Sequence, residues 1–259
     1  MIKFFRKIRQ QLLTENPPDG RAGKFSKYLI YGIGEVILIV IGILLALYLN
    51  NINSEQKSKL VEIELLNELK SNVNSSIKSF ERTLESERNY LGYNLLILDY
   101  LDNKKPYDDT LLKPFGAYFW TVSSNPISGG YTYLKSKGID LITNDSLRKN
   151  LSVLFENEFL IIKEENQIWA NNLQQNISYP YHVSHFRRYF LKDSISGDIE
   201  VAKPFNYNAL IYDDKFKSIN AEIISNRNWN INSLQDLIIK SEIVVKEIED
   251  ELKFLYDQK

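Results

Sequence analysis

Cysteine is absent from this chain of 259 residues, and histidine occurs only twice. Without cysteine there is no disulfide framework, thiolate metal site, cysteine nucleophile or lipoprotein acylation site. His182 and His185 would share one face of a helix, and histidine pairs can bind zinc. Because no acid lies between Glu165 and Asp193 to complete a ligand set, we expect no metal and no cofactor.

Signatures of catalysis and nucleotide binding are also missing. The segment from Ser128 to Tyr131, SGGY, lacks the Lys-Ser/Thr of a phosphate loop and is better explained as a turn before a helix. The nearby SNPISG lacks the glycines that flank the serine of a nucleophile elbow. The sequence therefore predicts a protein that is not an enzyme and has no nucleic-acid partner.

Charge is scarce in one long apolar stretch. Residues 28–49 contain a single charged side chain, Glu35, and as a helix these 22 residues would span about 33 Å, which matches a hydrocarbon core of about 30 Å. A cleaved signal peptide is the weaker interpretation, because the preceding region is long and ALYLNNINSE lacks a small-x-small cleavage site. We predict a transmembrane helix at 28–49.

The charge asymmetry around this stretch predicts its orientation. Seven basic residues and two acids precede Tyr28, which favours a cytoplasmic N-terminus by the positive-inside rule. Residues 1–27 would form a cytoplasmic basic segment whose start, MIKFFRKIRQQLL, has the pattern of an amphipathic helix on anionic lipid of the inner leaflet. Residues 50–259 would then be a periplasmic domain of a bacterial inner-membrane protein.

Heptad patterns predict that this domain is an α-helical bundle with long first and last helices. Nine of twelve positions in the first frame are apolar, which predicts one helix over 54–102 that continues from the membrane span. The frame comprises Ile63, Leu66, Lys70, Val73, Ile77, Phe80, Leu84, Glu87, Leu91, Asn94, Leu98 and Leu101. Its polar members argue against a strict two-stranded coiled coil. The last helix repeats the heptad at Ile224, Ile231, Ile238, Val245 and Leu252, with Leu234, Ile248 and Leu255 three positions on from their partners. Leu237 and Val244 widen this stripe, which predicts packing against more than one neighbouring helix.

The middle of the chain predicts shorter elements. A short helix should stop at Gly138, and a longer one should begin with Asn144 or Asp145 as its N-cap. We expect Leu147, Leu151, Leu154 and Phe155 on the buried face of that longer helix. The aromatic-rich segment from about Ile177 to Asp214 predicts short helices and loops, with one short strand at GDIEVAK.

Three stretches together resemble a known family. The chain resembles an uncharacterised family of small single-span membrane proteins of the Bacteroidota. The resemblance lies in MIKFFRKIRQ, in the span GIGEVILIVIGILLALYLNN and in the later YTYLKSKGIDLITNDSLRKNLSVLF. The similarity is strongest over residues 1–54. It implies an inner-membrane location and a helical exported domain, and it assigns no catalytic residue. An aromatic residue follows the paired asparagines in that family, whereas this chain has Ile52.

Glu35 is the most informative residue of the span. Outside the membrane it would leave residues 36–49, about 21 Å of helix, which is too short to cross. Gly42 and Ala46 share its helical face and form a small-xxx-small pair. We expect this face to contact another membrane helix, in a homo-oligomer or with other membrane subunits. Glu35 snorkelling toward the headgroups and a proton-conducting role remain alternatives.

A second set of residues is a candidate ligand contact. Arg187 and Arg188, near Tyr179, Tyr181 and Tyr189, could bind an anionic ligand instead of forming a solvated face. Trp120 and Trp169 could line a pocket, although such aromatics are most often core residues. The expected function is therefore an oligomeric scaffold or a subunit of an envelope complex. The alternative is a periplasmic ligand-binding sensor that signals through a partner.

Overall fold

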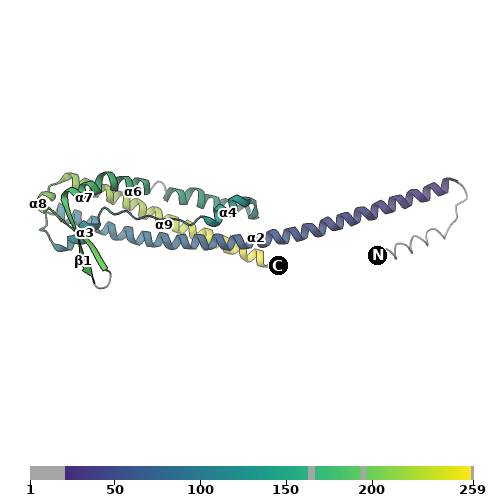
Figure 1. Ribbon diagram of the computed structural model, residues 1–259, viewed down its shortest axis with the longest axis horizontal. Helices are drawn as coiled ribbons and strands as arrows, with labels where there is room; N and C mark the ends of the chain where they lie inside the picture. The colour runs from purple at the N-terminus through teal and green to yellow at the C-terminus, as the bar shows by residue number, and fades with distance from the viewer. Residues whose placement is uncertain (1–20, 163–166, 194–196, 258–259) are drawn as a thin grey trace. The chain divides into compact units, whose positions relative to one another are not determined.

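The computed structural model describes residues 21–162, 167–193 and 197–257 (Figure 1). The chain divides into two compact units, unit 1 (residues 1–59) and unit 2 (residues 60–259). The amphipathic helix expected over residues 1–13 lies outside the described part of the chain.

The fold is mainly α-helical, as predicted, with long first and last helices that pack together in unit 2. The α-helices are α2 (Arg21–Asp102), α3 (Leu112–Ala117), α4 (Gly129–Lys137), α5 (Asp145–Val153), α6 (Gln167–Leu173), α7 (Tyr179–His185), α8 (Tyr207–Leu210) and α9 (Asp214–Asp257). The 3₁₀ turns are η1 (Asp109–Leu111) and η2 (Ile139–Leu141), and the π-helical segments are η3 (Leu154–Glu158) and η5 (Gln174–Ser178). Figure 1 shows α9 beside α2 and beside the row of helices that includes α6 and α7.

The predicted continuity of the first helix is confirmed. α2 is 82 residues long and ends at Asp102. Just beyond, Lys104 takes a positive φ of 49°, and the backbone N–H of Lys105 donates to the carbonyl of Tyr100. Pro106 follows and cannot continue a helix.

The buried seam of the long helices differs in part from the predicted heptads. On α2, Leu66, Val73, Phe80, Glu87, Asn94 and Leu101 are buried as expected. Ile63 and Ile77 of the predicted frame are buried as well, whereas Leu69, Thr83 and Ile97 are more buried than the predicted positions beside them, Lys70, Leu84 and Leu98. On α9 Leu234, Leu237, Val244, Ile248, Leu252 and Leu255 are buried as predicted, and the seam also runs through Ile223, Arg227, Asn230, Ser241 and Glu251. Polar side chains occupy several seam positions, and a hydrophobic pattern alone does not find them.

The predicted helix boundaries in the middle of the chain are confirmed. α4 ends at Lys137, and its C-cap is Gly138, whose φ of 112° favours glycine. Asn144 is the N-cap of α5, and its side-chain oxygen accepts from the backbone N–H groups of Ser146 and Leu147, both at 3.1 Å. All four apolar residues predicted for the inner face of this helix are buried.

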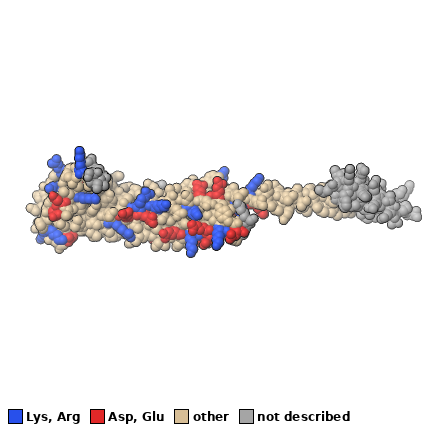
Figure 2. All heavy atoms as spheres, turned by 90° about the horizontal axis from the view of Figure 1, so that it is seen from below, with Lys and Arg blue, Asp and Glu red and all other residues tan. Residues whose placement is uncertain are grey.

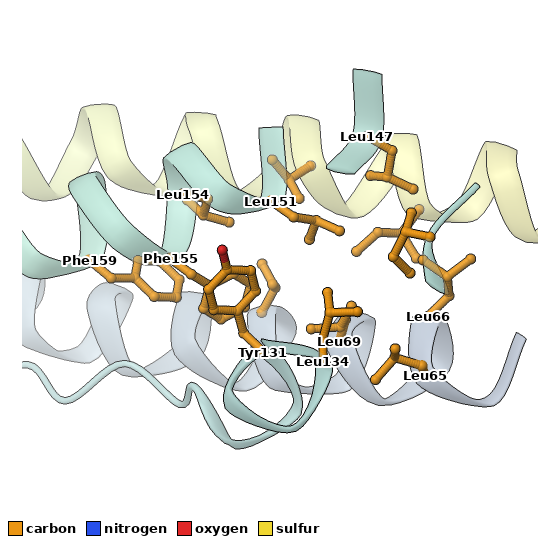
Figure 3. Close-up of a cluster of buried hydrophobic side chains, with 14 of the residues drawn as sticks. Leu65, Leu66, Leu69, Tyr131, Leu134, Leu147, Leu151, Leu154, Phe155 and Phe159 are labelled. Atoms are coloured by element: carbon orange, nitrogen blue, oxygen red, sulfur yellow. The ribbon is translucent and has the colours of Figure 1, made fainter. Parts of the chain in front are cut away.

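One apolar core lies between α2, α4, α5 and α9 (Figure 3). Leu65, Leu66 and Leu69 of α2 lie opposite Leu147, Leu151 and Leu154, and Tyr131 and Leu134 of α4 close the side. The Tyr131 ring stacks on Phe155 with centroids 4.7 Å apart, and its hydroxyl donates to Glu156 at 2.9 Å. A second, aromatic-rich core joins the far end of α2 to α3, α7, α9 and the strands.

The aromatic segment forms a β-hairpin in addition to short helices. β1 (Phe186–Asp193) pairs antiparallel with β2 (Gly197–Pro204), from Phe186 opposite Pro204 to Asp193 opposite Gly197. The strand predicted at GDIEVAK corresponds to β2, but the expectation of helix and loop for Phe186–Asp193 is wrong. FRRYFLKD does not alternate polar and apolar residues, and its strand depends on pairing with β2.

Gly116 of α3 lets β2 approach the helix closely. A Cβ atom at this position would lie 2.8 Å from both the Glu200 carbonyl oxygen and the Val201 Cα. Contact at that distance is excluded for any residue with a side chain, so glycine permits the packing. This contact fixes the hairpin on the end of the bundle that contains α3.

Candidate functional site

The apolar part of α2 in unit 1 is the first candidate site. Every large apolar side chain from Ile33 to Leu49 is exposed, by 46% to 63%. Glu35 is exposed as well, and a Cβ atom on Gly42 would meet no other atom within 4 Å. Glu35, Gly42 and Ala46, seven and four residues apart, lie on one side of this helix. The face is open for another helix or for lipid.

A buried ion pair forms the second candidate site, inside unit 2. Nη1 of Arg227 on α9 donates to Oε2 of Glu87 on α2 at 2.6 Å, and the two side chains are 4% and 2% exposed. Nε of Arg227 donates to the side-chain oxygen of Asn94 at 3.0 Å. The Asn94 amide in turn donates to the side-chain oxygen of Asn220 at 2.8 Å, so three hydrogen bonds join α2 to α9 here.

The same arginine holds the segment that follows α3. Its Nη2 donates to the carbonyl oxygens of Tyr118 and Trp120 at 3.1 Å and 2.6 Å. Burial lowers the pKa of Arg227, and the nearby Glu87 carboxylate opposes that change. Arg227 is thus a charged hub that satisfies two carbonyl groups, a carboxylate and an amide.

A second arginine covers the other side of this segment. The Arg188 guanidinium of β1 lies 5.1 Å and 5.3 Å from the ring centroids of Phe119 and Trp120, and its Nη1 pairs with Glu200 at 2.6 Å. The ring centroid of Tyr179 lies 5.9 Å from the same guanidinium, so three aromatic rings surround Arg188. Cation–π contacts of this kind stabilise a partly desolvated guanidinium. The hairpin is therefore attached to the bundle through Arg188.

The histidine pair predicted from sequence lies on α7, but the rings have different surroundings. His182 is 2% exposed and packs 4.5 Å from Phe119 and 5.0 Å from Phe186 by ring centroids. Burial, and then the Arg188 charge, lowers the pKa of His182 to about 4. His185 stacks on Tyr181 at 3.9 Å. Among the residues that the structure describes, no group of three metal-ligating side chains forms.

Two small cavities lie on either side of Glu87. One is bounded by Thr121, Gln174 and Arg227 and the other by Thr83 and Asn230, and each has a volume of about 20 Å³. The π-helical segment η5 begins at Gln174, and such π-bulges often occur at functional sites. Each cavity has the volume for a single water molecule with polar partners, and neither could hold a small-molecule ligand.

The predicted ligand residues do not converge on one pocket. Trp120 and Arg188 are in contact, whereas Arg187 is exposed on the opposite face of β1 and Trp169 is 46% exposed on α6. Sequence reasoning missed Arg227. The polar heptad positions Glu87 and Asn94 were the available signal, because a buried carboxylate in a helix seam requires a cation from another segment.

These features define a class: a mainly helical protein with one apolar helix, near the N-terminus, that is long enough to cross a membrane. Hydropathy and length identify that helix as the candidate span within the described residues. No protein-family model, curated protein sequence or solved structure matches the chain.

Proposed function

We propose that the chain is a non-enzymatic, single-span inner-membrane protein that serves as an oligomeric scaffold or as a subunit of an envelope complex. The observation that carries this proposal is the uncovered apolar helix of unit 1, with a carboxylate and a small-residue pair on one side. Such a surface requires lipid or another helix around it. Its membership of the Bacteroidota family that it resembles is part of the same proposal.

The orientation follows from charge. The seven basic residues before Tyr28 support a cytoplasmic N-terminus in contact with anionic lipid. The apolar helix would then occupy 28–49, and residues 50–259 would be periplasmic.

Glu35 favours a protein contact over lipid alone. A charged residue near the centre of a membrane helix costs about 2.5–3.5 kcal/mol, and less toward the ends. A second helix that approaches at Gly42 and Ala46 could supply a hydrogen-bond partner and remove much of that cost. The face therefore suits assembly with a second copy or with another membrane subunit.

The interior of unit 2 gives more support to the scaffold than to the ligand-binding sensor. The cavities beside Glu87 have the volume of one water molecule each, and Arg227 is fully engaged with groups of the protein itself. A sensor would need a ligand-sized pocket with uncommitted polar groups. This interior instead resembles a packed bundle that holds its helices in register.

Cysteine crosslinking in membranes tests the proposal cleanly, because the native chain has no cysteine. Ala46→Cys should form a crosslinked dimer or a larger product, whereas Leu44→Cys, on the opposite side of the helix, should not. Glu35→Leu, which removes the hydrogen-bonding group, should weaken association by about 3- to 30-fold, since an interhelical hydrogen bond contributes about 0.6–2 kcal/mol. Glu55→Leu, beyond the span on the same helix, is the matched control. Equal crosslinking from Ala46→Cys and Leu44→Cys, or association unchanged by Glu35→Leu, would refute the assembly face.

A further inference from the structure

One side of α6 and α7 presents large apolar side chains to solvent. Helical structure continues from α6 through η5 into α7, and exposed residues recur along it every three or four positions, at Ile168, Asn172, Asn176, Tyr179 and Val183. Residues with that spacing lie along one side of a helix. Ile168 is 59% exposed and Val183 is 56% exposed. We refer to these five residues as the outer face of α6–α7, which lies along the upper border of the bundle in Figure 1.

This outer face has no charged side chain. Between Glu165 and Arg187 the sequence contains no Asp, Glu, Lys or Arg, and the two histidines of this stretch pack on Phe119 and Tyr181. Elsewhere the bundle surface is charged: α2 has five exposed charged residues over 78–88, and Figure 2 shows both signs of charge along the bundle. Depletion of charge together with exposed aromatic residues is typical of the centre of a protein interface.

Amide side chains lie among the apolar ones on the same side. Asn172, Gln175 and Asn176 are exposed, and Trp169 and Ile177, each 46% exposed, flank them. An amide has both donors and an acceptor, so it can pair with the same amide of another copy. Asparagine at a contact position of paired helices fixes their register. The polar groups of this face are therefore complementary to themselves.

We propose that the outer face of α6–α7 packs on the same face of a second copy, with the two helices parallel and in register. This inference rests on the proposed single-span anchoring, which gives every copy the same orientation across the membrane. In a parallel two-fold contact each residue meets its own counterpart, so a charged residue would meet a like charge at a cost of several kcal/mol. An uncharged face avoids this cost, whereas the outer side of α9, with exposed Glu242, Lys246 and Glu249, does not.

The outer face of α6–α7 is too small to hold two soluble copies together. From Ile168 to Val183 a helix is about 23 Å long, and a strip about 10 Å wide covers on the order of 250 Å² per copy. A standard stable interface covers about 800 Å² per partner. Two chains held in one membrane by their spans have a high effective concentration, which allows a weak contact to form. We therefore expect this contact between full chains in a membrane.

Disulfide crosslinking of the full chain in membranes tests the contact, because the native chain has no cysteine. Ile168→Cys and Val183→Cys should each give a crosslinked homodimer, since counterparts meet at both ends of a parallel face. Ile239→Cys, 56% exposed on α9, is the matched control and should give little dimer. Crosslinking of Ile168→Cys in one chain to Val183→Cys in another, with neither linked to itself, would mean an antiparallel pair and overturn the proposal.

A charge exchange at Asn172 identifies the occupant of the face. Asn172→Glu and Asn172→Lys are each combined with Ile168→Cys and with a different tag. Each variant alone should lose crosslinked dimer about tenfold, because like charges then meet across the contact. Production of both in one cell should restore dimers between the two tags, since the charges are then opposite. Gln235→Glu, at an exposed position of α9, should leave the Ile168→Cys dimer unchanged.

Other results would overturn the proposal. Failure of the mixed charges to restore the dimer would mean that the two faces do not meet. Crosslinking of Ile168→Cys to an unlike protein would assign the face to another subunit, and quenching of a fluorophore on Val183→Cys by brominated lipid would assign it to the membrane. Ala46→Cys separates this inference from the proposed function. Dimers from Ala46→Cys without dimers from Ile168→Cys would refute the outer face alone, and the reverse result would refute the membrane face alone.

Discussion

Arg227→Met should be among the most destabilising single substitutions in the protein. It leaves the Glu87 carboxylate, 2% exposed, without its cation and frees the carbonyl groups of Tyr118 and Trp120. Breaking a buried ion pair by removal of one partner costs about 3–5 kcal/mol. For a domain of this size each kcal/mol lowers Tm by about 2–4 °C, so a loss of about 6–20 °C is expected.

A double-mutant cycle separates the ion pair from the rest of the network. In a Glu87→Leu background, Arg227→Met should lower the free energy of unfolding by only about 1–3 kcal/mol, because it then leaves only the two carbonyl groups unpaired. The assay is thermal unfolding followed by circular dichroism, with the full chain in mild detergent. Lys105→Met, which removes the exposed pair with Asp99 at 2.5 Å, is the control and should leave Tm nearly unchanged.

Two results would refute this reasoning. One is an Arg227→Met protein that melts within about 2 °C of the wild type, a change below 1 kcal/mol for a domain of this size. The other is strict additivity of Glu87→Leu and Arg227→Met, which would mean that the two buried charges do not interact.

Two further predictions concern the aromatic core and the hairpin. The folded state keeps His182 neutral, because its pKa is about 4 there and 6.5 in the unfolded chain. The stability that the neutral ring contributes is therefore fully present above pH 6.5, and the free energy of unfolding should fall by roughly 2–3 kcal/mol as the pH drops to 4. His182→Phe should remove this slope in melting curves taken across that range, and an unchanged slope would assign it to other groups. Gly116→Ala should lower stability by about 1–3 kcal/mol, since its Cβ meets backbone at 2.8 Å. Gly92→Ala, with open space around it on α2, should instead raise stability by about 0.5–1 kcal/mol; equal effects at the two glycines would contradict the close approach.

The sequence was most informative where structure depends on local periodicity. The extent of α2, the stop at Gly138, the Asn144 cap and the buried face of α5 all follow from signals within a few residues, and the structure bears them out. β1 was missed because its pairing partner, not its own pattern, makes it a strand. Arg227 was missed for a related reason: its carboxylate partner is 140 residues away in the chain.

The polar seam explains why a scaffold would keep buried charge that an apolar core could replace. If every seam position of α2 and α9 were leucine, a shift of one helix by a heptad, about 10.5 Å, would cost little. The actual seam opposes such a shift, because Arg227 finds Glu87, Asn94 and two carbonyl groups together in one register only. Any other register would bury a guanidinium and a carboxylate apart from each other, at several kcal/mol. The same contacts hold Tyr118–Trp120, on which Arg188 of the hairpin packs. We infer that the ion pair specifies where the hairpin sits along the bundle, so loss of Arg227 should displace β1 even under conditions in which the helices remain folded.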